Sequence, residues 1–144
     1  MDKDDVILKS AQKNKKSIVK EYLNKYEYSS SDNPNAIFMA GMPGAGKTEF
    51  ARRLIPQLTT TPIHIDMDEI AEHIENYKPK IAHLFRRGAT VILERLYDKS
   101  IDRGLDILMD GTFSSNKAIQ NIERALSHGC KVCIYFISPV PLTA

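Results

Sequence analysis

The stretch AIFMAGMPGAGKT, residues 36–48, decides the fold of this chain. It starts as an apolar run and continues into a glycine-rich turn that ends in Lys47 and Thr48. A glycine, four further residues and then Gly-Lys-Thr are typical of a phosphate-binding loop, which joins a strand to a helix. We therefore expect a strand before Gly41, a helix from Lys47 to Leu54, and a nucleotide phosphate held between them.

The loop predicts both a ligand and a metal. Its backbone N–H groups turn towards the anion, and the positive end of the following helix adds to the attraction. Lys47 is expected to reach the β- and γ-phosphates of a bound nucleotide, and the hydroxyl of Thr48 to bind Mg²⁺. The predicted nucleotide-binding residues are Gly41, Met42, Pro43, Gly44, Ala45, Gly46, Lys47, Thr48 and Glu49.

Apolar runs and helical patterns alternate from residue 36 onward. Strands without polar alternation, joined by helices, indicate a parallel sheet covered on both faces. The sequence thus predicts a three-layer α/β/α fold with a parallel sheet and a phosphate loop over residues 36–144, after a helical lead-in and linker over residues 1–35. The expected strands are 36–41, 62–68, 105–111 and 131–139. The further expected helices are 68–77, 79–103 and 114–129. Asp68 is the expected N-cap of the first of these helices and Ser114 or Ser115 that of the last, and Gly104 and Gly129 are expected to end the second and the third.

The composition fits one cytoplasmic domain. The chain has 144 residues, a formal charge of +2, and 42% hydrophobic and 26% charged residues, which gives no argument for a nucleic-acid or membrane partner. No apolar run approaches the ~20 residues of a membrane span, and the N-terminus lacks the pattern of a signal peptide. The cysteines, Cys130 and Cys133, fall where we expect a buried strand; residues three apart there face opposite ways, so we interpret them as apolar strand residues rather than a metal or redox centre.

Three aspartates lie at the C-terminal ends of predicted strands, at the edge of a parallel sheet where ligands bind. Asp66 and Asp68 could bind metal or activate a hydroxyl, although Asp68 could also simply cap its helix. Asp110 ends ILMD and is similar to the acidic residue that orients Mg²⁺ in nucleotide-binding proteins; it could instead hold a substrate hydroxyl or form a turn with Gly111. The residues alone predict a nucleotide-binding α/β domain that uses Mg²⁺ and transfers a phosphoryl group.

Three segments together resemble the zeta toxin family, which are kinases of toxin–antitoxin systems. The segments are AIFMAGMPGAGKTEFARRL, PIHIDMDEI and DILMDGT. The resemblance covers roughly residues 36–140. It implies that ATP phosphorylates UDP-N-acetylglucosamine, that Asp68 is the base, that a protein antitoxin is a partner, and that the sugar nucleotide is contacted by Asp66, Glu94, Asp110 and Thr112. Asp66 or Asp110 remains a candidate further Mg²⁺ ligand beside Thr48.

Two departures from that family bear on activity. Asp110 stands where the family has a longer glutamate. The resemblance also implies an arginine-bearing segment and a further strand after the fourth strand, which this sequence lacks. Arg86, Arg87 and Arg95 are candidate replacements, although a solvated helix face is the explanation that we favour for them. The alternatives are therefore a kinase for another hydroxylated small molecule, or a nucleotide-binding module that has lost catalysis.

Overall fold

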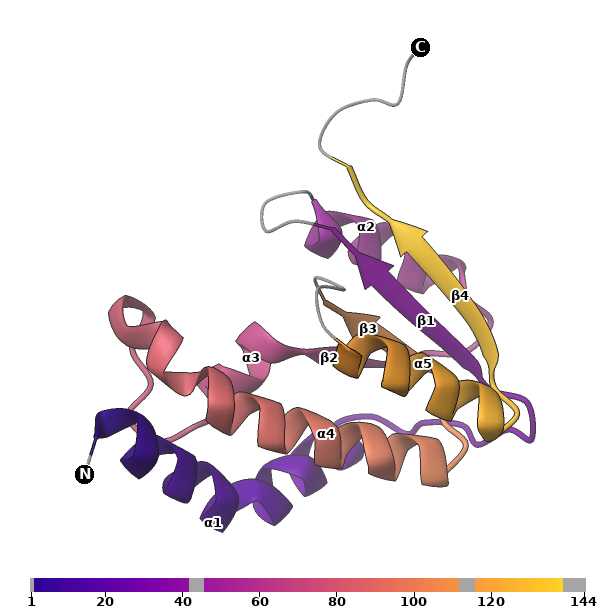
Figure 1. Cartoon of the computed structure of the whole chain (residues 1–144). Helices are drawn as coiled ribbons and strands as arrows, with labels where there is room; N and C mark the ends of the chain where they lie inside the picture. Colours follow the sequence, from indigo (N-terminus) through magenta and orange to yellow (C-terminus); the bar gives the residue numbers. More distant parts are fainter. Residues whose placement is uncertain (1, 42–45, 112–115, 139–144) are drawn as a thin grey trace. The chain divides into compact units, whose positions relative to one another are not determined.

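The computed structural model of the chain describes residues 2–41, 46–111 and 116–138 (Figure 1). The chain divides into two compact units. The first unit joins Met1–Glu27 to Ile65–Ser100, and the second joins Tyr28–His64 to Ile101–Ala144. The predicted division into residues 1–35 and 36–144 stays a prediction.

The sheet has four strands in the order β2-β3-β1-β4. Their bounds are β1 Asn35–Ala40, β2 Ile63–Asp66, β3 Ile107–Asp110 and β4 Lys131–Phe136. The central strand β1 pairs in parallel with β3, where Met39 lies opposite Asp110, and with β4, where Met39 lies opposite Tyr135. Because parallel strands end at the same edge of a sheet, the residue after β1 and the last residue of β3 meet there.

Within the second unit, helices lie on both sides of these strands. They are α2 (Lys47–Leu54), followed by the 3-10 turn η1 (Ile55–Gln57), and α5 (Asn116–Ser127). Ala51 of α2 packs in a buried cluster with Ile37, Met39 and Leu108. Figure 1 shows α2 behind β1 and β4 and α5 in front of the sheet. Opposite faces are expected, because the connection from β1 to β2 and the one from β3 to β4 run in opposite directions across the sheet and both are right-handed.

The first unit is helical. It contains α1 (Lys3–Asn24), α3 (Met67–Glu72), the 3-10 segment η2 (Pro79–Phe85) and most of α4 (Arg86–Asp102). Gly88 of α4 marks a close approach to α1, since a Cβ atom placed there would lie 2.9 Å from the Cβ of Ala11. On the surface, Arg87 pairs with Asp4 and Asp5 at 3.1 and 3.2 Å. The helix that the sequence predicts in the lead-in is confirmed, since α1 covers Lys3–Asn24.

Helix starts and stops follow the sequence in part: the predicted helix 68–77 is observed only over Met67–Glu72. α2 begins and ends as predicted, and Gly104 and Gly129 have positive φ values of 68° and 81°, as expected of residues that end helices. The predicted caps Ser114 and Ser115 lie outside the described residues. One predicted helix, 79–103, is wrong in its first part: residues 79–85 form 3-10 turns with a kink at Ile81, and the α-helix begins only at Arg86.

The predicted strand 131–139 is confirmed over Lys131–Phe136, but the expectation that this strand is buried is wrong. β4 ends at Phe136, and it is the last strand in the order, so it has a strand neighbour on one side only among the described residues. Cys133 and Ile134 are exposed, and Phe136 is 75% exposed. Cys130 is buried but lies before the strand, and neither cysteine is in a disulfide.

Candidate active site

The phosphate loop is set up by a buried strand and a glycine. Five of the six residues of β1 are buried, so the strand holds the start of the loop firmly in the sheet. Gly46 has φ 94°, a conformation that favours glycine, and α2 begins at the next residue with no side-chain cap. The N–H groups of its first turn are therefore available to an anion. Contacts predicted for Met42, Pro43, Gly44 and Ala45 lie outside the described residues.

Lys47 turns towards the end of β3. Its ammonium nitrogen lies 3.5 Å from Oδ1 of Asp110 and donates a hydrogen bond to the carbonyl oxygen of Gly111 at 3.2 Å. The side chain of Asp110 is 7% exposed and that of Lys47 13%. A buried carboxylate needs a cation or several donors nearby, and Lys47 supplies both charge and a donor. The structure thus brings together two residues that the sequence analysis predicted separately.

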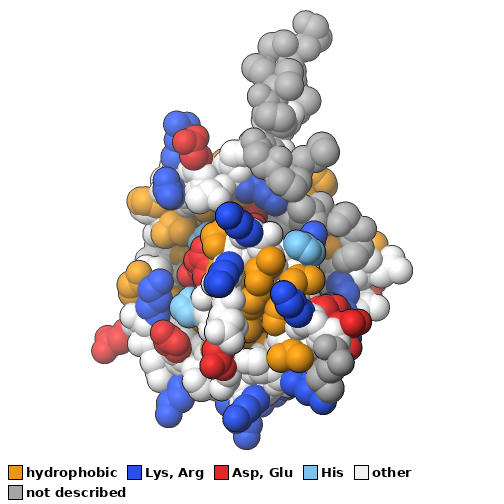
Figure 2. Space-filling model, turned by 90° about the vertical axis from the view of Figure 1, so that its left-hand side faces the viewer, with side chains coloured by type: hydrophobic (Ala, Val, Ile, Leu, Met, Phe, Trp, Pro, Cys, Tyr) orange, Lys and Arg blue, Asp and Glu red, His pale blue; other side chains and the backbone are white. Residues whose placement is uncertain are grey.

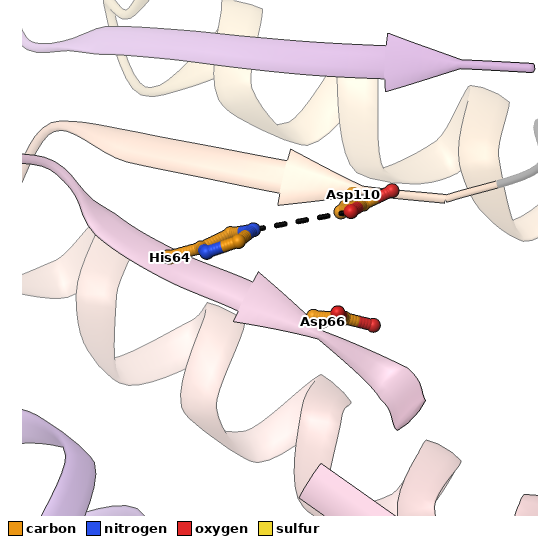
Figure 3. Close-up of side chains that lie close together, drawn as sticks. All are labelled: His64, Asp66 and Asp110. Carbon is orange, nitrogen blue, oxygen red and sulfur yellow. Dashed lines mark ion pairs between the residues drawn. The ribbon is translucent and has the colours of Figure 1, made fainter. Parts of the chain in front are cut away.

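His64 completes this group, and the sequence analysis missed it. Its Nε2 atom lies 3.9 Å from Oδ2 of Asp110, so Lys47 and His64 face different oxygens of one carboxylate. Figure 3 shows the imidazole of His64 and the carboxylate of Asp110 turned towards each other from the neighbouring strands β2 and β3. The available signal was a polar residue between Ile63 and Ile65, both fully buried, because alternation along a strand puts it on the other face.

Asp66 and Asp68 lie at the start of α3, in the first unit. The predicted cap is wrong: α3 starts at Met67, and Asp66 is the N-cap, whose carboxylate accepts a hydrogen bond from the backbone N–H of Asp68 at 3.0 Å. The strand ends two residues earlier than predicted, which moves the cap by the same two residues. As a result, the carboxylate of Asp68 is exposed in the first turn and is not used for capping.

The other predicted residues are placed as follows. Thr48 and Glu49 are exposed in the first turn of α2, and Glu94 is half-buried on α4. Thr112 lies outside the described residues. Of the three arginines, Arg86 is exposed and Arg95 half-buried, whereas Arg87 is held by Asp4 and Asp5, whose hydrogen bonds raise its pKa. The interpretation of Arg87 as part of a solvated helix face is the one that fits these ion pairs.

The surface charge is mixed. The face shown in Figure 2 carries lysines and arginines interspersed with aspartates and glutamates around a hydrophobic area. This agrees with the formal charge of +2. In the described part of the chain, none of the helices combines the length and hydropathy needed to span a bilayer.

The lysine of the phosphate loop and its ion pair with an acid at the end of a neighbouring strand place this chain in the class of nucleotide-binding α/β proteins. The model of the zeta toxin family matches residues 19–144, so the chain belongs to that family. A comparison with curated protein sequences found no match.

Solved structures confirm the predicted fold, a three-layer α/β/α arrangement around a four-stranded parallel sheet. One similar structure is a chain from the PezAT chromosomal toxin–antitoxin system of Streptococcus pneumoniae, with a TM-score of 0.78, 22% identity, and coverage of 86% of this chain and 55% of that one. A second is a putative kinase from Chloroflexus aurantiacus, with a TM-score of 0.58, 17% identity, and coverage of 73% and 59%. A third, from the Pnkp1/Rnl/Hen1 complex, has a TM-score of 0.53 and 17% identity, with coverage of 78% and 38%. This chain therefore spans between about a third and three fifths of the length of these relatives.

Proposed function

We propose that the chain is an ATP-dependent phosphotransferase of zeta-toxin type, which phosphorylates a hydroxyl group of a sugar nucleotide similar to UDP-N-acetylglucosamine. The observation that carries the proposal is the position of Lys47, at the first residue of α2 and 3.5 Å from the buried carboxylate of Asp110. Membership of the zeta toxin family supports the reaction class. The sugar-nucleotide substrate rests on the family resemblance of the sequence.

Lys47 and the backbone bind the nucleotide. The N–H groups at the start of α2 and the loop Gly41 to Thr48 surround the β-phosphate, and the ammonium of Lys47 moves from Asp110 to the β- and γ-phosphate oxygens. The positive charge there lowers the energy of the transition state, in which negative charge spreads over the transferring phosphoryl group. Most of the catalysis in such sites comes from this alignment and charge stabilisation.

The residues at this site fit Mg²⁺. The exposed hydroxyl of Thr48 and the carboxylate of Asp110 or Asp66 offer the oxygen ligands that the ion prefers. When bound, Mg²⁺ would neutralise part of the negative charge of the phosphate groups.

Asp68 is the proposed base. Its carboxylate is exposed and does not cap α3, because Asp66 does so. An exposed carboxylate is suited to accept the proton of the attacking hydroxyl, while the bond from the hydroxyl oxygen to the γ-phosphorus forms and the bond from that phosphorus to ADP breaks. Asp66, Glu94, Asp110 and Thr112 are the proposed contacts of the substrate. The relative from a toxin–antitoxin system supports a further proposal, that a protein antitoxin binds this chain.

Mass spectrometry of UDP-N-acetylglucosamine after incubation with Mg²⁺-ATP tests the proposal. We expect a mass gain of one phosphate, and no gain with Lys47→Met, which has a similar shape without the charge. Asp68→Asn should bind ATP like the wild type but transfer no phosphate. Transfer by Asp68→Asn at the wild-type rate would show that Asp68 is not the base. If the wild type binds ATP but leaves the sugar nucleotide unchanged, a panel of other hydroxylated compounds separates a different acceptor from a module without catalysis.

A further inference from the structure

We infer that His64 is a positioning residue for Asp110: it holds the carboxylate in place when Lys47 leaves it for the nucleotide. The inference rests on the proposed nucleotide site and adds to it a residue that the phosphate-loop pattern does not contain. It starts from the carboxylate itself, which is 7% exposed at the end of a strand whose four residues are all buried.

The first step is that Lys47 has two tasks. It lies 3.5 Å from Oδ1 of Asp110 and donates a hydrogen bond to the carbonyl oxygen of Gly111. A phosphate-loop lysine is needed at the β- and γ-phosphates when nucleotide binds. Its ammonium then gives up at least part of its contact with Asp110. A buried carboxylate that loses its cation is destabilised, because little water can reach it.

The second step is that His64 faces the second oxygen of this carboxylate, the one that Lys47 does not face. Its Nε2 atom is buried and has no hydrogen-bond partner among the described residues. It lies 3.9 Å from Oδ2 of Asp110. A movement of about 1 Å brings the two atoms to the distance of an N–H···O bond, with Nε2–H as the donor. The side chain needs only to turn slightly, since β2 and β3 are neighbours in the sheet.

The third step concerns the choice of residue. Ile63 and Ile65 on either side are fully buried, at 0% exposure, whereas His64 is on the other face of β2 with its side chain 28% exposed. An apolar residue would serve the strand equally well. A ring with a donor nitrogen serves the carboxylate in addition, because two groups then share it, one for each oxygen.

A double-mutant cycle on stability tests this without any ligand. His64→Met and His64→Gln have the same length, and only glutamine retains an N–H donor; Lys47→Met removes the ammonium. With Lys47 present, His64→Met should change the thermal unfolding midpoint little. In the Lys47→Met background it should lower the midpoint by about 4 °C more, since Asp110 then has neither partner. His64→Gln should restore most of the loss in that background.

The same two variants are then compared for binding of ATP by calorimetry in the presence of EDTA, so that no Mg²⁺ can bind Asp110 in place of Lys47. His64→Met should weaken binding about tenfold, because Lys47 would have to leave an otherwise unpaired carboxylate, and His64→Gln should stay within about threefold of the wild type. Additive effects of the two substitutions on the unfolding midpoint, or equal behaviour of the Met and Gln variants, would overturn the role of His64.

If Lys47→Met/His64→Met does not fold, folding of Lys47→Met/His64→Gln supports the role of His64. Failure of both double variants to fold rejects it. A wild type that binds no ATP would refute the nucleotide site, while the unliganded cycle still decides on His64.

Discussion

Lys47 and Asp110 form an ion pair of 3.5 Å between the first residue of α2 and the last residue of β3. These positions are 63 residues apart in the chain and meet because β1 and β3 are parallel neighbours, with Met39 opposite Asp110. The ammonium that the nucleotide needs is therefore already engaged by the protein. Phosphate and carboxylate compete for it, and this competition lowers the affinity for nucleotide.

Asp110→Asn should consequently bind ATP more tightly, by about fivefold when Mg²⁺ is absent. The substitution removes the competing charge and keeps the shape of the side chain. Calorimetric titration with ATP in the presence of EDTA measures the effect. The matched control is Asp110→Asn in the Lys47→Met background, where no gain is expected. Weaker binding by Asp110→Asn alone would mean that the ion pair does not compete with the nucleotide.

The parts of this site that could be predicted from the sequence are those with a fixed local spacing. The loop, its lysine and the start of α2 follow from a pattern in which the residue order sets the backbone conformation, including a positive φ at Gly46. His64 could not be found in this way. Its importance comes from the neighbouring strand, and strand order depends on the packing of the whole sheet.

Boundaries and burial were harder to predict for a related reason. A difference of two residues at the end of β2 changes the cap of α3 from Asp68 to Asp66, and the run IHIDMD fits either boundary. The apolar spacing over residues 79–85 suits both a 3-10 helix and an α-helix. The run KVCIYF has the composition of a buried strand, but its exposure depends on the elements that pack around it.

Gly88→Ala should destabilise the helical unit. The new Cβ would lie 2.9 Å from the Cβ of Ala11 and 3.3 Å from Cδ1 of Ile74, so α4 would have to move away from α1. The gain in helix propensity is outweighed, and we expect a net loss of about 1–2 kcal/mol in the free energy of unfolding. Urea denaturation measures it. Exchanging the two small residues, as Gly88→Ala with Ala11→Gly, should recover most of the loss; no recovery would show that another contact causes it.

Phe136→Lys should reduce self-association of the protein. Phe136 is 75% exposed at the end of β4, the last strand in the sheet order, and Ile134 beside it is 38% exposed. Apolar side chains next to the open edge of a strand favour pairing between molecules, and a lysine there opposes it. Light scattering over a range of protein concentrations compares the variant with the wild type. Lys131→Arg, a change on the same strand that keeps the charge, is the control and should behave like the wild type.

Tyr22→Phe should make the helical unit less sensitive to alkaline pH. Burial, followed by the nearby carboxylate of Glu69, raises the pKa of Tyr22 well above its ordinary value. The unfolded chain loses this proton above pH about 10 while the folded chain keeps it, so ionisation favours the unfolded state there. The stabilisation linked to this proton is complete below that pH and is lost as the pH rises towards the pKa of the folded state.

Urea denaturation at pH 8 and pH 10.5 should therefore show a larger loss of stability for the wild type than for Tyr22→Phe. Tyr26→Phe is the control, because Tyr26 is 57% exposed. Between the two pH values, this variant should lose as much stability as the wild type. Equal losses for the wild type and Tyr22→Phe would show that the hydroxyl of Tyr22 ionises as readily in the folded protein as in the unfolded chain.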